Sequence, residues 1–332
     1  MKDNFIKKYW QENPFVIKEF TENLSMYKQL CFEIEFYVRN LLDKNKIRYA
    51  SVTSRAKTLN SFIEKTERKK YKNLFEEITD FAGVRIVALY KDEISSIEKL
   101  IEKEFEIIEK IDRSNDLEAD YFGYEAIHYV LKLGENCKGV RYDNLKKINC
   151  EVQVRTILQD AWAIVAHHIT YKKEKDIPQA LMRKLNRLVG LFETADEQFV
   201  SIKNERKKYI DSIELNPSKV LEEEINLDSL TEYLKYKFPE LRIGDYDLER
   251  IPAAKSFNKY KKIKELDNII NNSEKAINEY KKQMNDPYFA ECSTKLLNVA
   301  LAIHNREYFE NSGYSTGFGE IATKIVEEFK KW

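Results

Sequence analysis

The chain has 332 residues, of which 43% are hydrophobic and 34% are charged, as in a folded globular protein rather than a disordered one. Its 56 basic and 56 acidic side chains cancel, so the net charge indicates no particular partner. No apolar run approaches the roughly 20 residues of a membrane helix, and the N-terminal segment lacks a secretory signal. The four scattered cysteines favour reduced buried thiols over a zinc site or disulfides. We therefore expect a cytoplasmic protein.

The first two hundred or so residues alternate between helix and strand patterns. Apolar spacing predicts helices over 22–44 and 57–70, with an extended segment over 49–54 between them. The run GVRIVALY over 83–90 is almost continuously apolar, which favours a central strand covered on both faces. Further predicted elements are a helix over 92–104, strands over 105–111, 126–133 and 150–156, and helices over 156–171 and 179–209. Strands separated by helices predict an α/β sheet.

A break at Asn216-Pro217 suggests a domain boundary near 211–224, because a residue before proline disfavours the helical conformation. We predict one domain over 1–212 and a second, mainly helical domain over 213–332. The helices expected in the second domain cover 228–237, 259–282, 287–305 and 317–331. No motif in this part indicates a chemical function, although a regulatory role is compatible with its position.

A dense positive segment lies between Lys46 and Lys72, with nine basic residues and two acidic ones. Such a field attracts phosphate, although a charge run is more often a solvated helix face. Lys57 and Lys65 are eight residues apart, so they can share one face of a helix, and Arg55 precedes them at the strand–helix junction. Helix N-termini favour anions, which strengthens the phosphate interpretation.

Two carboxylates stand next to predicted strands. Asp80 precedes the strand over 83–90, and Glu151 opens the strand over 150–156. Carboxylates from adjacent strands can hold Mg²⁺, which binds a few oxygen ligands and keeps waters for substrate phosphates. Taken singly, each carboxylate is also compatible with an ordinary salt bridge at a strand end.

Four blocks in this order resemble the synthetase region of RelA/SpoT-type alarmone synthetases. They are 52–65 (VTSRAKTLNSFIEK), 80–86 (DFAGVRI), 123–128 (GYEAIH) and 151–156 (EVQVRT), followed by Trp162-Ala163, His167 and Tyr171-Lys172. The resemblance covers roughly residues 20–205 and is greatest to the small, synthetase-only members, which include toxic relatives. It implies a nucleotidyltransferase-like mixed β-sheet flanked by helices, and it does not reach the C-terminal third.

The resemblance also implies roles for individual residues. Arg55 and Arg85 would sandwich the adenine of ATP, and Lys57 and Lys65 would bind its triphosphate. Asp80 and Glu151 would hold Mg²⁺ and act as the catalytic pair. On the acceptor side, Tyr124 would stack on the base, and His128, Gln153 and Arg155 would complete the site. We interpret Trp162 as a packing residue.

The implied activity is Mg²⁺-dependent transfer of pyrophosphate from ATP to the 3′-hydroxyl of GTP or GDP, which gives (p)ppGpp and AMP. The acceptor half departs from the family pattern: Glu125 and Ala126 follow Tyr124, and 92–120 holds eleven acids against four bases. Two alternatives therefore stay open. One is a toxin-like relative that modifies the tRNA 3′ end or makes adenosine alarmones, restrained by the C-terminal region; for it, Arg68, Lys69, Lys70 and Lys72 offer a basic surface. The other is an inactive binding module. Homo-oligomers are common among the small synthetases.

Overall fold

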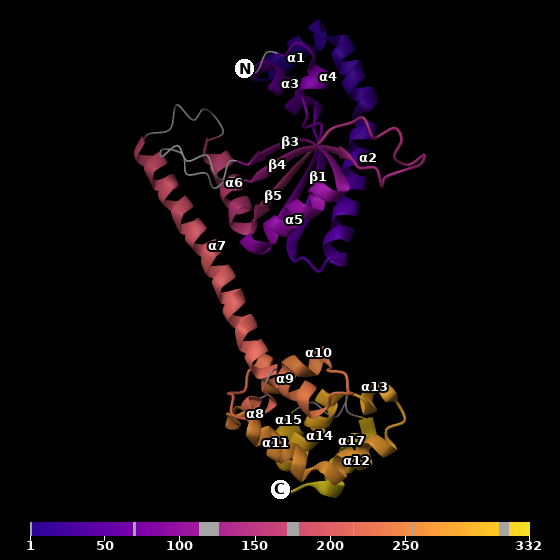
Figure 1. Cartoon of the computed structure of the whole chain (residues 1–332), viewed down its shortest axis with the longest axis vertical. Coiled ribbons are helices and arrows are strands. Elements are labelled where there is room, and N and C mark those ends of the chain that lie inside the picture. Colours follow the sequence, from indigo (N-terminus) through magenta and orange to yellow (C-terminus); the bar gives the residue numbers. More distant parts are fainter. Residues whose placement is uncertain are drawn as a thin grey trace. The chain divides into compact units, whose positions relative to one another are not determined.

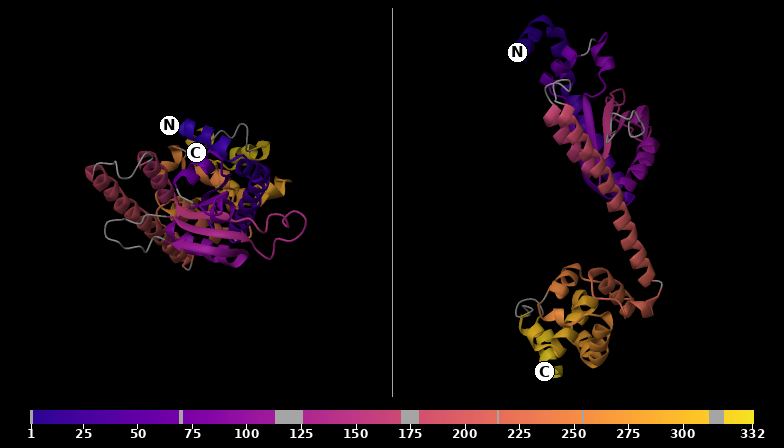
Figure 2. Two further views of the ribbon diagram at one scale, coloured as in Figure 1. Left: turned by 90° about the horizontal axis from the view of Figure 1, so that it is seen from above. Right: turned by 90° about the vertical axis from the view of Figure 1, so that its left-hand side faces the viewer.

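The computed structural model describes residues 2–332 except 69–70, 113–125, 171–178, 215, 254 and 312–318. The chain folds into two compact units, Met1–Ile202 and Lys203–Trp332. Helix α7 (Gln179–Glu214) crosses this division without a break, as Figures 1 and 2 show from three sides. Whether residues 1–212 fold as an independent domain stays a prediction.

The first unit is built on one five-stranded sheet in the order β1-β2-β5-β4-β3. The strands are β1 (Tyr49–Ala56), β2 (Ala82–Ala88), β3 (Phe105–Asp112), β4 (Ile127–Leu133) and β5 (Cys150–Thr156). The central pair β2–β5 is parallel, and the other three pairs are antiparallel. The predicted mixed sheet is confirmed, with strand ends within a few residues of the expected ones.

Helices α2 (Pro14–Lys44) and α5 (Lys91–Glu104) cover one face of this sheet (Figure 1). Alternate strand residues, which point to one face, are buried in a single cluster with apolar side chains of both helices. This cluster includes Leu30, Ile34, Val38, Val84, Ile86, Ile97, Ile101, Val152 and Val154. The opposite face is partly open, because Gly83 and Arg85 are only half-buried. The prediction that β2 is covered on both faces is therefore right only for its last three residues.

A second, aromatic cluster anchors the segment that leads into β2. It joins the N-terminal half of α2 to α1 (Lys2–Glu12), α3 (Leu59–Arg68) and α4 (Leu74–Glu77). The ring of Phe81 stacks on Tyr27 with 4.8 Å between centroids, and Phe62 stacks on Phe20 at 4.9 Å. Helix α1 was not expected from the sequence patterns. The packing matters for the site because Asp80 directly precedes Phe81.

Helices α6 (Ile157–Thr170) and α7 follow β5. The two helices contact each other through Trp162 and Phe192, whose rings meet edge-on at 6.3 Å. The buried Thr156 donates from Oγ1 to Oδ2 of Asp196 at 2.7 Å, which ties the end of β5 to α7. All four cysteines are free and buried, as predicted. Within the described residues, no helix combines the length and apolar character that a membrane span requires.

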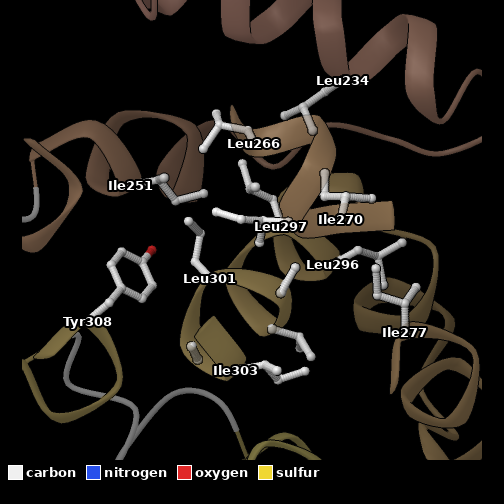
Figure 3. Close-up of a cluster of buried hydrophobic side chains, with 14 of the residues drawn as sticks. Leu234, Ile251, Leu266, Ile270, Ile277, Leu296, Leu297, Leu301, Ile303 and Tyr308 are labelled. Carbon is white, nitrogen blue, oxygen red and sulfur yellow. The ribbon is translucent and has the colours of Figure 1, made fainter. Parts of the chain in front are cut away.

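The second unit is helical, as predicted, and packs around the buried helix α14 (Figure 3). After the end of α7 it contains α8 (Pro217–Val220), α9 (Leu227–Lys237), α10 (Asp245–Ala253), η2 (Lys255–Lys259), α11 (Ile263–Asn272), α12 (Glu274–Gln283), α13 (Pro287–Ala290), α14 (Ser293–His304), α15 (Arg306–Asn311) and α17 (Gly319–Phe329).

Two predicted helices of the second unit were wrong. The segment over 287–305 is divided into α13 and α14, because the backbone is not helical at residues 291–292. The other predicted helix covers 259–282. It is two helices, because the backbone leaves the helical conformation at Ser273, which ends α11 and begins α12. The side chain of Ser273 is buried and lies 3.1 Å from Nε2 of His304. The apolar spacing suggested one continuous helix, but the chain breaks it at Ser273, where the side chain contacts a residue that is distant in the sequence.

Candidate active site

The open face of the sheet carries a polar cavity of about 350 Å³ beside β1, β2 and β5. Its lining residues are Thr53, Ser54, Arg55, Ala56, Lys57, Thr58, Ser61, Asp80, Gly83, Val84, Arg85, Glu151 and Gln153. Six of the residues singled out from the sequence are among them. Their side chains come from segments far apart in the chain, so the sheet is what assembles the site.

Strand register explains why these side chains meet. Gly83 pairs with Arg55 on one side and with Glu151 on the other, and paired residues of neighbouring strands point to the same face. In the same way Arg85 pairs with Gln153. Because Gly83 has no side chain, β2 leaves open space in the cavity between Arg55 and Glu151.

Asp80 lies between two ammonium groups. Lys57 donates to its Oδ2 at 2.6 Å and Lys65 donates to its Oδ1 at 2.9 Å. The Lys57 side chain is only 13% exposed, and its backbone N–H donates to the Phe81 carbonyl at 2.8 Å. The lysines do not share a helix face, because α3 begins at Leu59 and Lys57 precedes it. They converge from a strand end and a helix.

Glu151 is held by two neighbours on the same face. Its Oε1 lies 2.9 Å from Nδ1 of His128 and accepts from Nε2 of Gln153 at 2.8 Å. The contact with His128, helped by Gln153 and by the charge of Lys65, lowers the pKa of Glu151 to about 2, although burial opposes this. Glu151 is therefore a carboxylate at neutral pH. Its Oε2 accepts no hydrogen bond from the side chains that the structure describes.

Asp160, in the first turn of α6, joins two arginines of the site. Its Oδ1 lies 3.1 Å from Nη1 of Arg85 and 3.5 Å from Nη1 of Arg155. Arg155 also donates from Nη2 to Oε1 of Gln153 at 2.6 Å. Sequence reasoning missed Asp160, since an acid in the first turn of a helix is ordinary and only the fold reveals its partners.

The acceptor side is described in part. His128 and Gln153 lie against Glu151, and the Arg155 side chain, which contacts Asp160, is 7% exposed. Tyr124 lies outside the described residues, as do Lys69, Lys70 and residues 113–120, the last part of the acidic segment over 92–120. Their assigned roles stay predictions.

The donor set fits a magnesium ion. Among the described residues, no group of three or more histidine, cysteine or carboxylate side chains gathers to form a metal centre. Two carboxylates, Asp80 and Glu151, line the same cavity. A hard cation that takes few protein oxygens and completes its shell with water and phosphate matches this set.

Comparison with known proteins gives several similar proteins, each of which aligns with about half of this chain. A solved GTP pyrophosphokinase family protein from Streptococcus pneumoniae aligns with TM-score 0.49 and 24% identity, over 57% of this chain and 96% of that chain. Two curated Bacillus subtilis (strain 168) proteins are similar. GTP pyrophosphokinase YwaC is 28% identical over 158 residues, 46% of this chain and 72% of the relative. GTP pyrophosphokinase YjbM is 25% identical over 199 residues, 57% of this chain and 90% of the relative.

A family model described as a region found in RelA / SpoT proteins matches residues 54–176. This segment runs from the end of β1 past α6 and contains all the catalytic, ATP-binding and acceptor-binding residues that we predict from the sequence. The first unit of the chain, Met1–Ile202, therefore contains a segment that is similar to the region found in RelA / SpoT proteins.

Proposed function

We propose that the protein transfers pyrophosphate from ATP to the 3′-hydroxyl of GTP or GDP and releases AMP. The observation that carries this proposal is the convergence of Asp80 and Glu151 on one cavity with Lys57 and two arginines, while Lys65 binds Asp80. The names of the two Bacillus subtilis relatives, both GTP pyrophosphokinases, support the reaction class and the guanosine acceptor.

ATP would occupy the side of the cavity formed by β1 and β2. Arg55 is exposed and Arg85 is half-buried on these paired strands, and planar guanidinium groups stack well on an adenine ring. The triphosphate would then lie toward Lys57 and Lys65. As it enters, phosphate oxygens can replace the Asp80 carboxylate as acceptors for the two ammonium groups, which keeps every charge paired.

Asp80 and Glu151 would hold Mg²⁺, which, when bound, neutralises charge on the phosphates as the bond to the α-phosphate breaks. The residues of the chain supply positioning. Lys57 and Lys65 hold the triphosphate so that the acceptor oxygen reaches the β-phosphorus in line. The new oxygen–phosphorus bond forms as the bond from the β-phosphorus to the bridging oxygen breaks. AMP leaves with that oxygen, and the hydroxyl proton passes to Asp80 or to solvent.

The acceptor would approach from the β4–β5 side. His128 and Gln153 are placed there, and both also hold Glu151. They would therefore link the position of the acceptor to the position of a metal-binding carboxylate. Tyr124 would stack on the acceptor base.

The activity test is to incubate the full-length protein with Mg²⁺ and ATP labelled in the β-phosphate. GTP, GDP, ATP or deacylated tRNA is offered in turn. We expect label on GTP or GDP and release of AMP. Label on tRNA alone would reject the guanosine acceptor, and label on none of the four would reject the activity.

The site is tested by two substitutions in the same assay. Asp80→Asn and Glu151→Gln should each abolish transfer while ATP still binds weakly. The matched control is Glu135→Gln, because Glu135 is an exposed carboxylate outside the cavity. Full activity in either of the first two variants would refute the role given to that carboxylate.

A further inference from the structure

A continuous series of polar contacts crosses the open face of the sheet from α6 to Glu151. Asp160 contacts Arg85 and Arg155. Arg155 donates from Nη2 to Oε1 of Gln153 at 2.6 Å, and Gln153 donates from Nε2 to Oε1 of Glu151 at 2.8 Å. At one end of the series Asp160 contacts Arg85, on the side of the cavity proposed for adenine. At the other end Gln153 contacts Glu151, on the side proposed for the metal.

We propose that Asp160 is a positioning residue that acts through two sets of contacts, a first arm and a second arm. The first arm fixes Arg85 for the donor base. The second acts through Arg155 and Gln153 and orients Glu151. The inference rests on the proposed function for the identity of the ligands, whereas the contacts themselves are independent of it.

The first arm follows from charge. Arg85 and Arg155 lie on adjacent parallel strands, where Arg85 pairs with Gln153 and Arg155 pairs with Val87. Two guanidinium groups this close repel each other, and the repulsion grows where water is scarce. The Asp160 side chain is 20% exposed and that of Arg155 is 7% exposed. One shared carboxylate between the two cations therefore holds Arg85 on its side of the cavity.

The second arm follows from hydrogen-bond complementarity. A guanidinium group only donates hydrogen bonds, so Arg155 fixes the carbonyl side of the Gln153 amide toward itself. The amide NH₂ group must then face Glu151, which only accepts as a carboxylate. With Oε1 occupied by Gln153 and His128, Oε2 is left toward the substrate. If the amide turned over, its carbonyl oxygen would face the Glu151 carboxylate, and two acceptors cannot form a hydrogen bond.

The position of Asp160 is itself well fixed. The Thr156 N–H donates to Oε1 of Gln159 at 2.8 Å, and the Gln159 N–H donates to Oγ1 of Thr156 at 3.1 Å. This reciprocal pair closes the first turn of α6 in the manner of a capping box. Thr156 also donates to Asp196 of α7. Asp160 therefore projects from a turn that is anchored on both sides.

The test uses Asp160→Asn, which keeps the shape and removes the charge, and Asp160→Glu, which keeps the charge. For Asp160→Asn we expect about a tenfold rise in KM for ATP through the first arm and about a tenfold fall in kcat through the second. Asp160→Glu should recover part of both. Gln153→Met should lower kcat with little change in KM for ATP, because Arg85 keeps its carboxylate.

A double variant separates positioning from a general effect on folding. If Asp160 acts on Glu151 through Gln153, Asp160→Asn combined with Gln153→Met should lower kcat by less than the product of the two single effects. Asp143→Asn is the matched control, since Asp143 forms an exposed ion pair with Lys146 outside this series. Values of kcat and KM within twofold of wild type for Asp160→Asn would overturn the inference. So would independent effects in the double variant, or a loss of stability with normal kinetics.

Failure of the proposed function would look different. In that case the wild-type protein transfers no label to any acceptor. The first arm can still be measured, as the dissociation constant of an ATP analogue with a methylene between its α- and β-phosphates. Asp160→Asn should weaken that analogue about tenfold, and unchanged affinity would overturn the first arm whatever the acceptor is.

Discussion

Replacing Lys57 by glutamine tests the cationic side of the cavity, because this lysine is the more buried of the two that hold Asp80. Its side chain is 13% exposed, whereas that of Lys65 is 36% exposed. In the free protein Lys57→Gln removes one of two ion pairs to the same carboxylate. In the ATP complex it removes an ammonium group that we place on the triphosphate. We expect the loss of ATP affinity to be larger than the loss of stability of the free protein.

A charge-assisted hydrogen bond to phosphate contributes about 1.5–3 kcal/mol, which corresponds to a loss of about 10- to 150-fold in ATP affinity. The stability of the free protein should change much less. Asp80 keeps its ion pair with Lys65 at 2.9 Å. The lost ion pair between Lys57 and Asp80 remains in contact with solvent, and such a pair contributes roughly 1 kcal/mol or less. Lys57→Gln should thus bind ATP poorly and yet unfold at nearly the wild-type denaturant concentration.

Calorimetric titration with the methylene ATP analogue measures the first quantity, and urea unfolding measures the second. Lys46→Gln is the control, since Lys46 belongs to the same basic segment but is exposed and lies outside the cavity lining. If a diffuse positive field attracted the nucleotide, both variants would weaken binding alike. Equal affinities for Lys46→Gln and Lys57→Gln, or wild-type affinity for Lys57→Gln, would refute the specific contact.

Other substitutions probe packing and charge. Gly134→Ala should destabilise the first unit by about 1–3 kcal/mol, because an added Cβ would lie 2.0 Å from the Glu104 carbonyl oxygen. Gly190→Ala in α7, where a Cβ meets nothing within 4 Å, should stabilise by up to about 1 kcal/mol; urea midpoints that shift in the same direction for both would contradict this. In the second unit, hydrogen bonds from Arg206 lower the pKa of Asp228 below its usual 3.8, although burial opposes this. Its contribution is therefore full above about pH 4 and is lost as pH falls through the folded-state pKa. At pH 7, Asp228→Asn should cost roughly 1 kcal/mol or less, and its unfolding free energy should converge with wild type on acidification. A gap that stays constant with pH would count against it.

Local patterns were enough to predict most of the first unit. Alternating or continuous apolar runs located β2, β3, β4 and β5, and β1 coincides with the extended segment predicted over 49–54. The sheet follows from strands separated by helices. The carboxylates at 80 and 151 could be paired in advance because each stands where a strand begins. In the structure both carboxylates line the same cavity, and the pairing of Gly83 with Glu151 brings the start of β2 beside the start of β5.

What sequence patterns missed depends on contacts between distant segments. Nothing near Asp160 indicates that it faces Arg85, since the two meet only after α6 packs beside β2. The contact between His128 and Glu151 likewise arises from the pairing of β4 with β5. The break at Ser273 escaped prediction for the same reason, because its partner His304 lies in another helix.

The parallel pairing of β2 with β5 has a consequence for biosynthesis. All the donor-side residues that we assign, from Arg55 to Arg85, leave the ribosome well before Glu151 does. Until β5 is made and inserts between β2 and β4, the nascent chain has lysines and Asp80 but no second carboxylate beside them. A chain that ends before β5 therefore contains the residues that we assign to ATP binding but lacks Glu151. Such truncated products should not have the proposed transferase activity.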